Sequence, residues 1–402
     1  MGLNGPLLSN RRFVQLWIGQ AASFVGDGVS MVALVILVVE ITGSASAVGG
    51  ALVARLLPTL AGPFFGVLAD RFDRRVILVS TDLARAILAV GLVFVRDLVI
   101  LYALIFLMGA ARALFNPTVR AAFPSVVGGG DLTRANSLIS TTFSVSIMVG
   151  PALGGLLVAG GGVRVAFLLD AATFLLSAAL LYRVPLPSAG VESGEGFFAE
   201  LKAGLGYLAG ARVPLAMVAG AFLTVLATDL ATPAEVFLAR ETFGAGDAGY
   251  GLLVGVWGAG MVVGSVCMGV LGDRVRLLPV YFVGVLTWAI ALVGTGLSPV
   301  FAVALGALAI AGVANGIDNV ITDTILQTRV PDAFLGRIFS VRFTGYGAAE
   351  ALAYPAGGLL VDSLGARQTY LLSGLATAGA GLLILLFVIT AAGKQTRKAE
   401  HS

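Results

Sequence analysis

The amino-acid sequence predicts an all-α membrane protein with twelve transmembrane helices in two six-helix halves. Its composition is the first reason: the 402 residues are 58% hydrophobic and only 12% charged, whereas a soluble domain carries about 25% charged residues. The second reason is a set of long apolar runs without the alternation typical of barrel strands. Because backbone polar groups in lipid must be satisfied within their own segment, such runs form helices. The third reason is an internal repeat.

The repeat is clearest in a charged loop between two apolar runs. The first copy reads Gly66-Val67-Leu68-Ala69-Asp70-Arg71-Phe72-Asp73-Arg74-Arg75. The second reads Gly269-Val270-Leu271-Gly272-Asp273-Arg274-Val275-Arg276. Both contain Gly-Val-Leu-small-Asp-Arg, at an offset of 203 residues from Gly66 to Gly269. Further along, Gly154-Gly155-Leu156-Leu157-Val158 matches Gly357-Gly358-Leu359-Leu360-Val361 at the same offset. Two halves in the same orientation form a parallel repeat with a cavity between them.

The first half covers residues 1–184. Runs of about 20 apolar residues cross a hydrocarbon core of roughly 30 Å. Arg11 and Arg12 precede the first run, Gly43-Ser44 forms the next turn, and a polar connector at 128–134 separates the fourth and fifth runs. The predicted spans are 13–39, 46–69, 76–95, 98–122, 136–160 and 164–184.

The second half, residues 212–393, follows the same plan. A stretch rich in Pro, Gly, Ser and Glu at 185–211 is the linker, and its 197–208 part resembles a short amphipathic helix on the membrane surface. Residues 394–402 form a charged tail. The predicted spans are 213–238, 248–272, 278–296, 299–326, 338–361 and 367–391.

The positive charges predict the orientation. With twelve spans, four arginines fall on one side of the membrane: Arg96, Arg164, Arg240 and Arg367. Sixteen lysines and arginines, from Arg11 to Lys398, fall on the other. Because Lys and Arg near span ends resist translocation, both termini and the linker are expected in the cytoplasm, with the chain in the cell membrane.

The residue inventory excludes several kinds of chemistry. Cys267 is the only cysteine and His401, in the polar tail, the only histidine. No intramolecular disulfide and no His–Cys metal cluster can form, and proton chemistry in the membrane falls to Asp and Glu. The sequence shows no basic patch with interleaved aromatics for nucleic acid, and no phosphate-binding Gly-Lys-Ser/Thr loop. An enzyme, a cofactor and direct use of ATP are therefore not expected.

Charges inside the spans are the candidate functional residues. A charge at the bilayer centre costs roughly 2.5–3.5 kcal/mol on insertion scales, so it needs a partner or a wet cavity. Six residues lie near span centres and are predicted to serve proton coupling or line a central cavity: Asp27, Arg55, Arg112, Asp229, Asp318 and Glu350. The alternative is a set of static salt bridges. Asp170, Glu235 and Asp323 lie nearer the interfaces and are expected to be solvated.

Asp27 is the candidate for the coupling proton. It lies near the middle of the first span between Gly26 and Gly28, and Arg55 lies near mid-depth in the second span. Burial disfavours a carboxylate's charged form and a nearby cation favours it. Making and breaking an Asp27–Arg55 contact could therefore bind and release a proton. A permanent bridge between two helices is the alternative.

Several motifs of the sequence resemble those of the major facilitator superfamily. Gly66-x-Leu68-Ala69-Asp70-Arg71-x-x-Arg74-Arg75 is similar to the superfamily's loop signature, although Asp73 stands where that signature usually has Gly. Ser146-x-x-x-Gly150-Pro151-x-x-Gly154-Gly155 resembles the fifth-span signature of drug/proton antiporters, with Ser in place of the first Gly. Other stretches, such as Leu16-Trp17-Ile18-Gly19-Gln20 and Asn116-Pro117, resemble the branch with macrolide efflux and enterobactin export proteins.

The resemblance implies roles for both motifs. In the loop, Asp70 would accept hydrogen bonds from the start of the eleventh span, near Gly336, as a conformational latch with Arg71, Arg74 and Arg75. Asp273 and Arg274 would play the paired role in the second half. A plain positive-inside loop is the alternative. The bend at Gly150-Pro151 and Gly154-Gly155 would serve antiport, or else ordinary small-residue packing.

The expected function is secondary active transport. The resemblance implies a monomeric, proton-coupled exporter of an amphipathic small molecule, drug-like or siderophore-like, that works by alternating access between the two halves. Uptake of a metabolite is the alternative, and a membrane sensor that transports nothing is a further one. The expected partners are the substrate, protons and the lipid bilayer, with the proton gradient as energy source.

Overall fold

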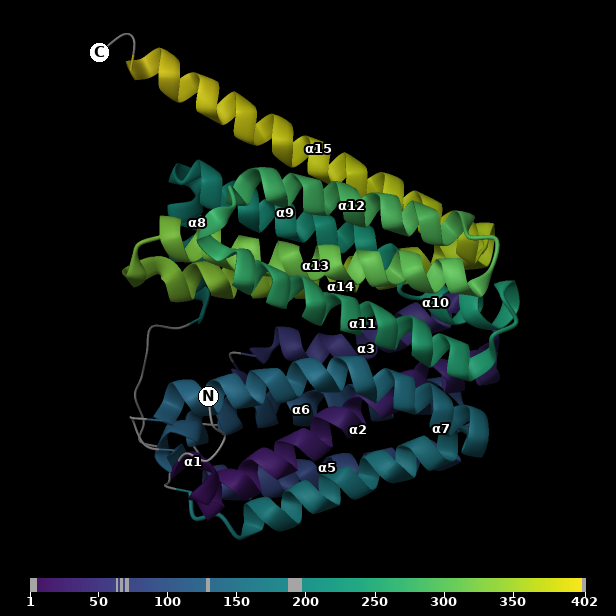
Figure 1. The fold of residues 1–402 in the computed structure, drawn as a ribbon. Helices are drawn as coiled ribbons and strands as arrows, with labels where there is room; N and C mark the ends of the chain where they lie inside the picture. The colour runs from purple at the N-terminus through teal and green to yellow at the C-terminus, as the bar shows by residue number, and fades with distance from the viewer. Residues whose placement is uncertain are drawn as a thin grey trace. The chain divides into compact units, whose positions relative to one another are not determined.

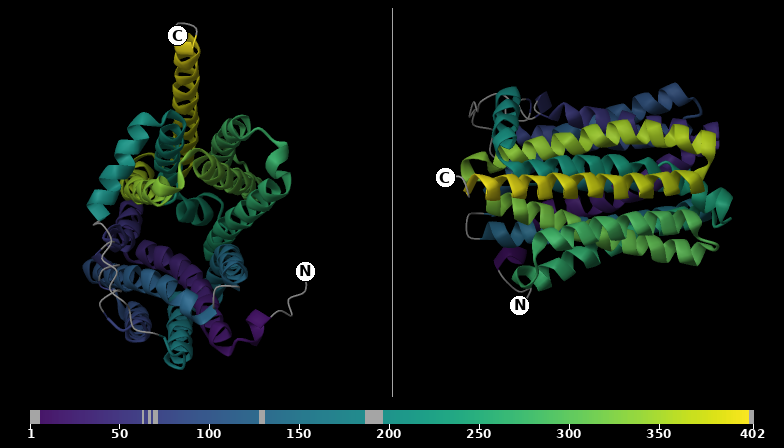
Figure 2. Two further views of the ribbon diagram at one scale, coloured as in Figure 1. Left: turned by 90° about the vertical axis from the view of Figure 1, so that its left-hand side faces the viewer. Right: turned by 90° about the horizontal axis from the view of Figure 1, so that it is seen from above.

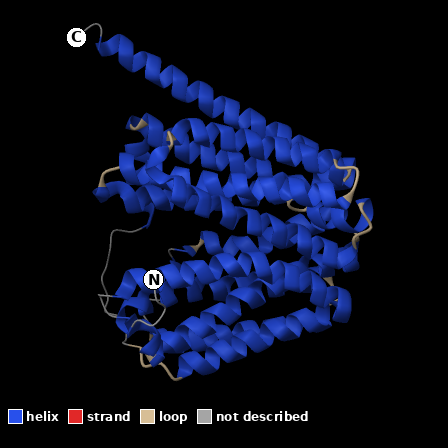
Figure 3. Ribbon diagram, viewed as in Figure 1, coloured by secondary structure: helices blue, strands red, loops and turns tan. Residues whose placement is uncertain are grey.

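The computed structural model describes residues 6–62, 64–65, 68, 72–127, 131–186 and 197–399. Within these ranges every regular element is a helix (Figure 3). In the first part of the chain the helices are α1 (Pro6–Ser9), α2 (Arg11–Thr42), α3 (Ala45–Leu60), α5 (Arg74–Phe94), α6 (Leu98–Val127) and α7 (Leu132–Tyr182). They are followed by α8 (Phe197–Gly210), α9 (Arg212–Thr228), η2 (Asp229–Ala231), α10 (Ala234–Phe237), η3 (Leu238–Thr242), α11 (Gly246–Leu271), η4 (Gly272–Arg274), α12 (Leu277–Leu297), α13 (Phe301–Arg329), α14 (Asp332–Leu364) and α15 (Ala366–Ala399).

A helix lies at every predicted span. Eight helices of the described chain are long and apolar enough to cross a membrane. The total of twelve spans stays a prediction, because α3 has only 16 residues and both α5 and α14 fall outside this group. The fifth and sixth spans form one 51-residue element, α7, whose backbone turns at Gly162 (φ 75°, ψ 171°). Figure 1 shows the two legs of α7 on either side of that turn.

Polar side chains set several helix starts. Asn10 accepts hydrogen bonds from the backbone N–H groups of Arg12 and Phe13 at the start of α2. Ser44 caps α3, and Asp73 caps α5 by accepting from Val76 N–H at 3.0 Å. These caps satisfy amide groups that a helix leaves free in its first turn. Asp73, which departs from the superfamily signature, therefore serves as a helix cap.

The chain divides into two compact units. Unit 1 contains Met1–Ser193 and Ala239–Gly255, and unit 2 contains Gly194–Leu238 and Val256–Ser402. In unit 1, α2 packs along α7, and α3, α5 and α6 complete the bundle (Figure 2). In unit 2, α12 packs on α13 and α15, and α9 packs on α14 and α15. The first part of α11 thus packs with the helices of unit 1.

Glycines permit the closest helix contacts, and the repeat preserves one of them. A Cβ on Gly109 of α6 would collide with the carbonyl oxygen of Arg55 on α3. Its repeat mate, Gly312 of α13, meets the carbonyl oxygen of Trp257 on α11 in the same way. Close backbone approach at small residues is the usual packing mode of membrane helices. In unit 1 this approach brings Arg55 beside the helix that carries Arg112.

The short helix α8 packs on protein in unit 2. Its Tyr207 ring stacks on Phe334 of α14, with centroids 4.8 Å apart. A Cβ on Gly204 would lie 3.1 Å from the carbonyl oxygen of Arg337. The helix expected within the linker is therefore present, and α14 packs on one of its faces. The domain boundaries at 184/185 and 211/212 stay predictions.

Candidate functional site

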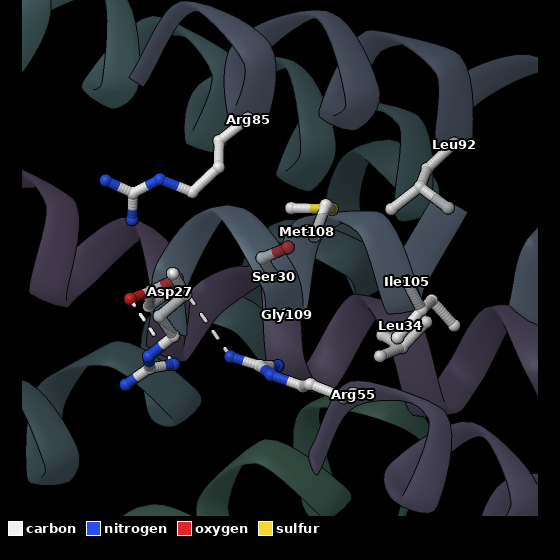
Figure 4. A pocket seen from close by; sticks show the side chains of 10 residues that line it. Asp27, Ser30, Leu34, Arg55, Arg85, Leu92, Ile105, Met108 and Gly109 are labelled. Atoms are coloured by element: carbon white, nitrogen blue, oxygen red, sulfur yellow. Dashed lines mark ion pairs between the residues drawn. The ribbon is translucent and has the colours of Figure 1, made fainter. Parts of the chain in front are cut away.

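Asp27 is the centre of an ion-pair cluster in unit 1. Its Oδ2 lies 3.5 Å from Nη1 of Arg112, and its Oδ1 lies 4.0 Å from Nη2 of Arg55. The three side chains come from α2, α3 and α6, and Figure 4 marks the ion pairs with dashed lines. The Asp27 side chain is only 18% exposed. The structure therefore brings together three of the six predicted residues, with two cations on one carboxylate.

The cluster borders a small cavity of about 30 Å³. Ser30 and Arg85 add polar groups to its wall, and Figure 4 shows Leu34, Leu92 and Ile105 together at its apolar end. A cavity of this size has room for one or two water molecules.

A second ion pair, which the sequence analysis did not single out, lies beside the cavity. Asp82 and Arg85, three residues apart on α5, form a short ion pair, and both are buried. The Arg85 guanidinium also lies over the rings of Phe115 and Phe174, at 4.3 and 4.4 Å from their centroids. The i, i+3 spacing of opposite charges was the available sequence signal. This pair has the features of a fixed structural bridge.

The expectation that Asp170 is solvated was wrong. Asp170 lies on the second leg of α7 with 0% exposure, and neither carboxyl oxygen accepts a hydrogen bond from a described residue. It is packed against Gly26 of α2, where a Cβ would lie 2.7 Å from Asp170 Oδ1. The physical reason is the intimate packing of α2 on α7, which depth along a span does not reveal. Asp170 therefore joins the group of acids around Asp27.

The other three predicted residues lie in unit 2. Asp229 begins η2 and Glu350 is on α14, two elements that pack together. Asp318 is on α13, buried, and its Oδ1 has no hydrogen-bond partner in the described chain. Their assignment to one central cavity with Asp27 stays a prediction.

Arg342 organises a polar cluster in unit 2 that the sequence analysis missed. This α14 side chain is 3% exposed and forms a short ion pair with Asp323 of α13. It also donates from Nη2 to the Tyr346 hydroxyl at 2.6 Å and to Asn319 Oδ1 at 3.4 Å. Asp323 is 45% exposed and still paired. The cluster ties α13 to α14.

The loop motif is only partly described. Gly66, Asp70 and Arg71 lie outside the described residues, and so does the Asp273 side chain, while Arg274 is exposed on η4. Arg74 donates to the carbonyl oxygen of Ala121 on α6 at 2.9 Å. Arg75 lies 4.5 Å from the Tyr182 ring at the end of α7. These two arginines thus tie the start of α5 to neighbouring helices of unit 1, and the latch stays a prediction.

The fifth-span motif lies in tight helix contacts. A Cβ on Gly150 would lie 3.0 Å from Gly28 Cα on α2, and one on Gly154 would lie 2.9 Å from the Val29 carbonyl oxygen. Pro151 is inside the same helix. Gly155 faces the other way, where a Cβ would lie 2.8 Å from Gly251 Cα on α11. One motif therefore packs α7 against both α2 and the start of α11.

A larger cavity of about 570 Å³ lies next to the cluster, also in unit 1. Its described walls come from α2, α6 and the start of α7. Arg112 lines both this cavity and the smaller one beside Asp27. Its volume lies within the range of small-molecule sites, which is about 300–1,000 Å³.

Comparison with known proteins gives the class. The structure superposes on the nucleoside transporter NupG with a TM-score of 0.78 at 12% identity, over 94% of this chain and 99% of that one. Its sequence is 27% identical to the uncharacterised MFS-type transporter YfiS of Bacillus subtilis, over 98% of this chain and 96% of the relative. The fold and these likenesses define a major facilitator transporter, a multi-pass membrane protein and not an enzyme.

Nearly the whole chain matches one family model. The family model of transmembrane secretion effectors matches residues 4–401, and the chain belongs to that family. Two relatives are named for export. The putative bacilysin exporter BacE of Bacillus subtilis is 29% identical, with 87% of this chain and 88% of the relative covered. Macrolide efflux protein A of Streptococcus pyogenes is 24% identical, with 90% and 92% covered.

Proposed function

We propose that this protein exports an amphipathic small molecule from the cell by proton-coupled alternating access, and that Asp27 binds the coupling proton. The family and the exporter names of its relatives support the direction of transport. The observation that carries the proton role is a single carboxylate that faces two arginines beside a cavity large enough for water.

The cluster contains one carboxylate and two guanidinium groups, so its positive and negative charges do not cancel. This excess of positive charge is what would let the cluster exchange a proton. In this structure the Asp27 carboxylate is paired with both arginines. A conformational change that withdraws Arg55 or Arg112 would leave the carboxylate in a poorly solvated place, where the neutral form is favoured. Contacts that differ between two states are what couples a bound proton to a conformational equilibrium.

Replacing Asp27 tests this role. Asp27→Asn is expected to insert and to bind substrate but to lose efflux driven by a pH gradient. The matched control is Asp97→Asn: Asp97 is exposed and caps the start of α6 by accepting from Val99 and Ile100, which asparagine can also do. Efflux of a panel of macrolides and siderophores from cells, with and without a protonophore, measures the effect. Wild-type protonophore-sensitive efflux by Asp27→Asn would refute the proposal.

The orientation is part of the proposal. We place both termini in the cytoplasm and the protein in the cell membrane, on the strength of the arginine distribution. The monomeric state is a separate part of the proposal. Cysteines at Thr133 and Ser363, both exposed, test the sidedness in a Cys267→Ala background, which removes the exposed native thiol. A membrane-impermeant thiol reagent on intact cells should label Ser363→Cys only. Labelling of Thr133→Cys alone would show that the orientation is the opposite of the one proposed.

A further inference from the structure

We infer that the larger cavity of unit 1 binds the acidic group of an anionic amphipathic molecule, with Arg120 as its anchor. This inference rests on the proposed export function and specifies its substrate class. It begins with charge. Two arginines, Arg112 and Arg120, line the cavity, and none of its described lining residues is acidic.

Arg120 has no partner of its own in the described chain. It lies near the end of α6, is exposed, and forms no ion pair or hydrogen bond with a described residue. Arg112, eight residues earlier and so about 12 Å away along the helix axis, is already engaged with Asp27. An acid bound at Arg120 therefore does not require Asp27 to give up Arg112. The substrate anchor and the proposed proton site are adjacent and separate.

The rest of the wall suits an amphipathic molecule. Phe24 of α2 and Phe143 of α7 meet edge to face at 5.2 Å, and both line the cavity with Phe123. Asn116, Asn136 and Ser140 add uncharged hydrogen-bonding groups. Aromatic walls with a few polar groups and one charged anchor are the usual composition of a small-molecule site. A guanidinium can bind a carboxylate, sulfonate or phosphate through two parallel hydrogen bonds.

The charge also fits export. A membrane potential that is negative inside favours the exit of an anion. The competing explanation for Arg120 is that it is one more positive charge at the cytoplasmic end of a span. In that case its charge would have no effect on what the cavity binds.

Two fluorescent probes with the same ring system separate these explanations. Anilinonaphthalene sulfonate carries one negative charge, and phenylnaphthylamine lacks the sulfonate and is neutral. Equilibrium binding is measured with the full-length protein in phosphatidylcholine nanodiscs, with empty nanodiscs subtracted. The wild type is expected to bind the sulfonate about tenfold or more tightly than the neutral probe, as one charge-assisted contact provides.

Variants assign the effect to one side chain. Arg120→Gln is expected to weaken sulfonate binding about tenfold and to leave the neutral probe unchanged, which also shows that the cavity is intact. Arg120→Lys should retain most of the sulfonate affinity. The matched control is Arg134→Gln, which removes an exposed arginine that pairs with Asp131 on the same side and does not line the cavity.

Three results would overturn the inference. The first is equal affinity of the wild type for both probes. The second is a loss of sulfonate affinity with Arg134→Gln as large as with Arg120→Gln. The third is displacement of the sulfonate by added phosphatidylglycerol, which would make the occupant a lipid headgroup. The proposed function fails differently. Asp27→Asn would then keep pH-driven efflux while the binding pattern at Arg120 stands.

Discussion

The same substitution at two buried aspartates of unit 1 should destabilise the protein at one position and have little effect at the other. Asp82 and Asp170 are both 0% exposed, but Asp82 pairs with Arg85, whereas neither carboxyl oxygen of Asp170 accepts a hydrogen bond from a described residue. Asp82→Asn leaves the Arg85 cation buried without its counter-charge. Asp170→Asn breaks no ion pair with a described residue and leaves no counter-ion buried alone.

The magnitude follows from the partners of Arg85. Removing one member of a buried ion pair costs about 3–5 kcal/mol. The rings of Phe115 and Phe174 still hold the guanidinium, so the lower end, about 3 kcal/mol, applies to Asp82→Asn. For a unit of this size that corresponds to a fall in Tm of about 6–12 °C. Asp170→Asn should change stability by less than about 1 kcal/mol.

Thermal unfolding of the purified protein in nanodiscs, followed by tryptophan fluorescence, measures both variants. Adding Arg85→Met to Asp82→Asn should restore part of the lost stability, because the unpaired buried charge is then gone. An equal fall in Tm for the two aspartate variants would refute the assignment of the bridge. So would a double variant that is no more stable than Asp82→Asn alone.

Two further predictions concern the repeated motifs. Gly155→Ala should lose about 1–3 kcal/mol of stability, because its Cβ would press on the backbone of α11. Gly160→Ala, whose Cβ would meet nothing within 4 Å, should be neutral or slightly stabilising. The same unfolding assay measures both variants, and equal Tm values would contradict the packing argument. Asp70→Asn should impair efflux far more than Asp73→Asn, since asparagine can keep the cap on α5 that Asp73 provides. Equal efflux by these two variants would remove the case for a specific latch contact of Asp70.

Most of the architecture was predictable from the chain alone. Apolar runs of span length place a helix at each predicted range, because lipid leaves the backbone no other way to satisfy its hydrogen bonds. The repeat anticipated related packing in the two halves, and Gly109 and Gly312 show it. Mid-span position singled out Asp27, Arg55 and Arg112, since a charge there needs a partner. Depth and sign alone did not give the pairing: the sequence suggested an Asp27–Arg55 contact, and the structure added the contact of Asp27 with Arg112.

Tertiary structure decided which buried charges meet. Asp170 was expected to be solvated, yet it is buried against α2. Asp82 and Arg85, which the sequence analysis did not single out, form a buried pair, and Arg85 lines the cavity beside Asp27. In unit 2, Arg342 reaches Asp323 on the preceding helix. Depth along a span can be counted in residues, but the face of a helix that meets a neighbour depends on rotation and close approach. Those are set by contacts such as Gly26 with Asp170 and Gly109 with Arg55, and a single sequence does not encode them as a local pattern.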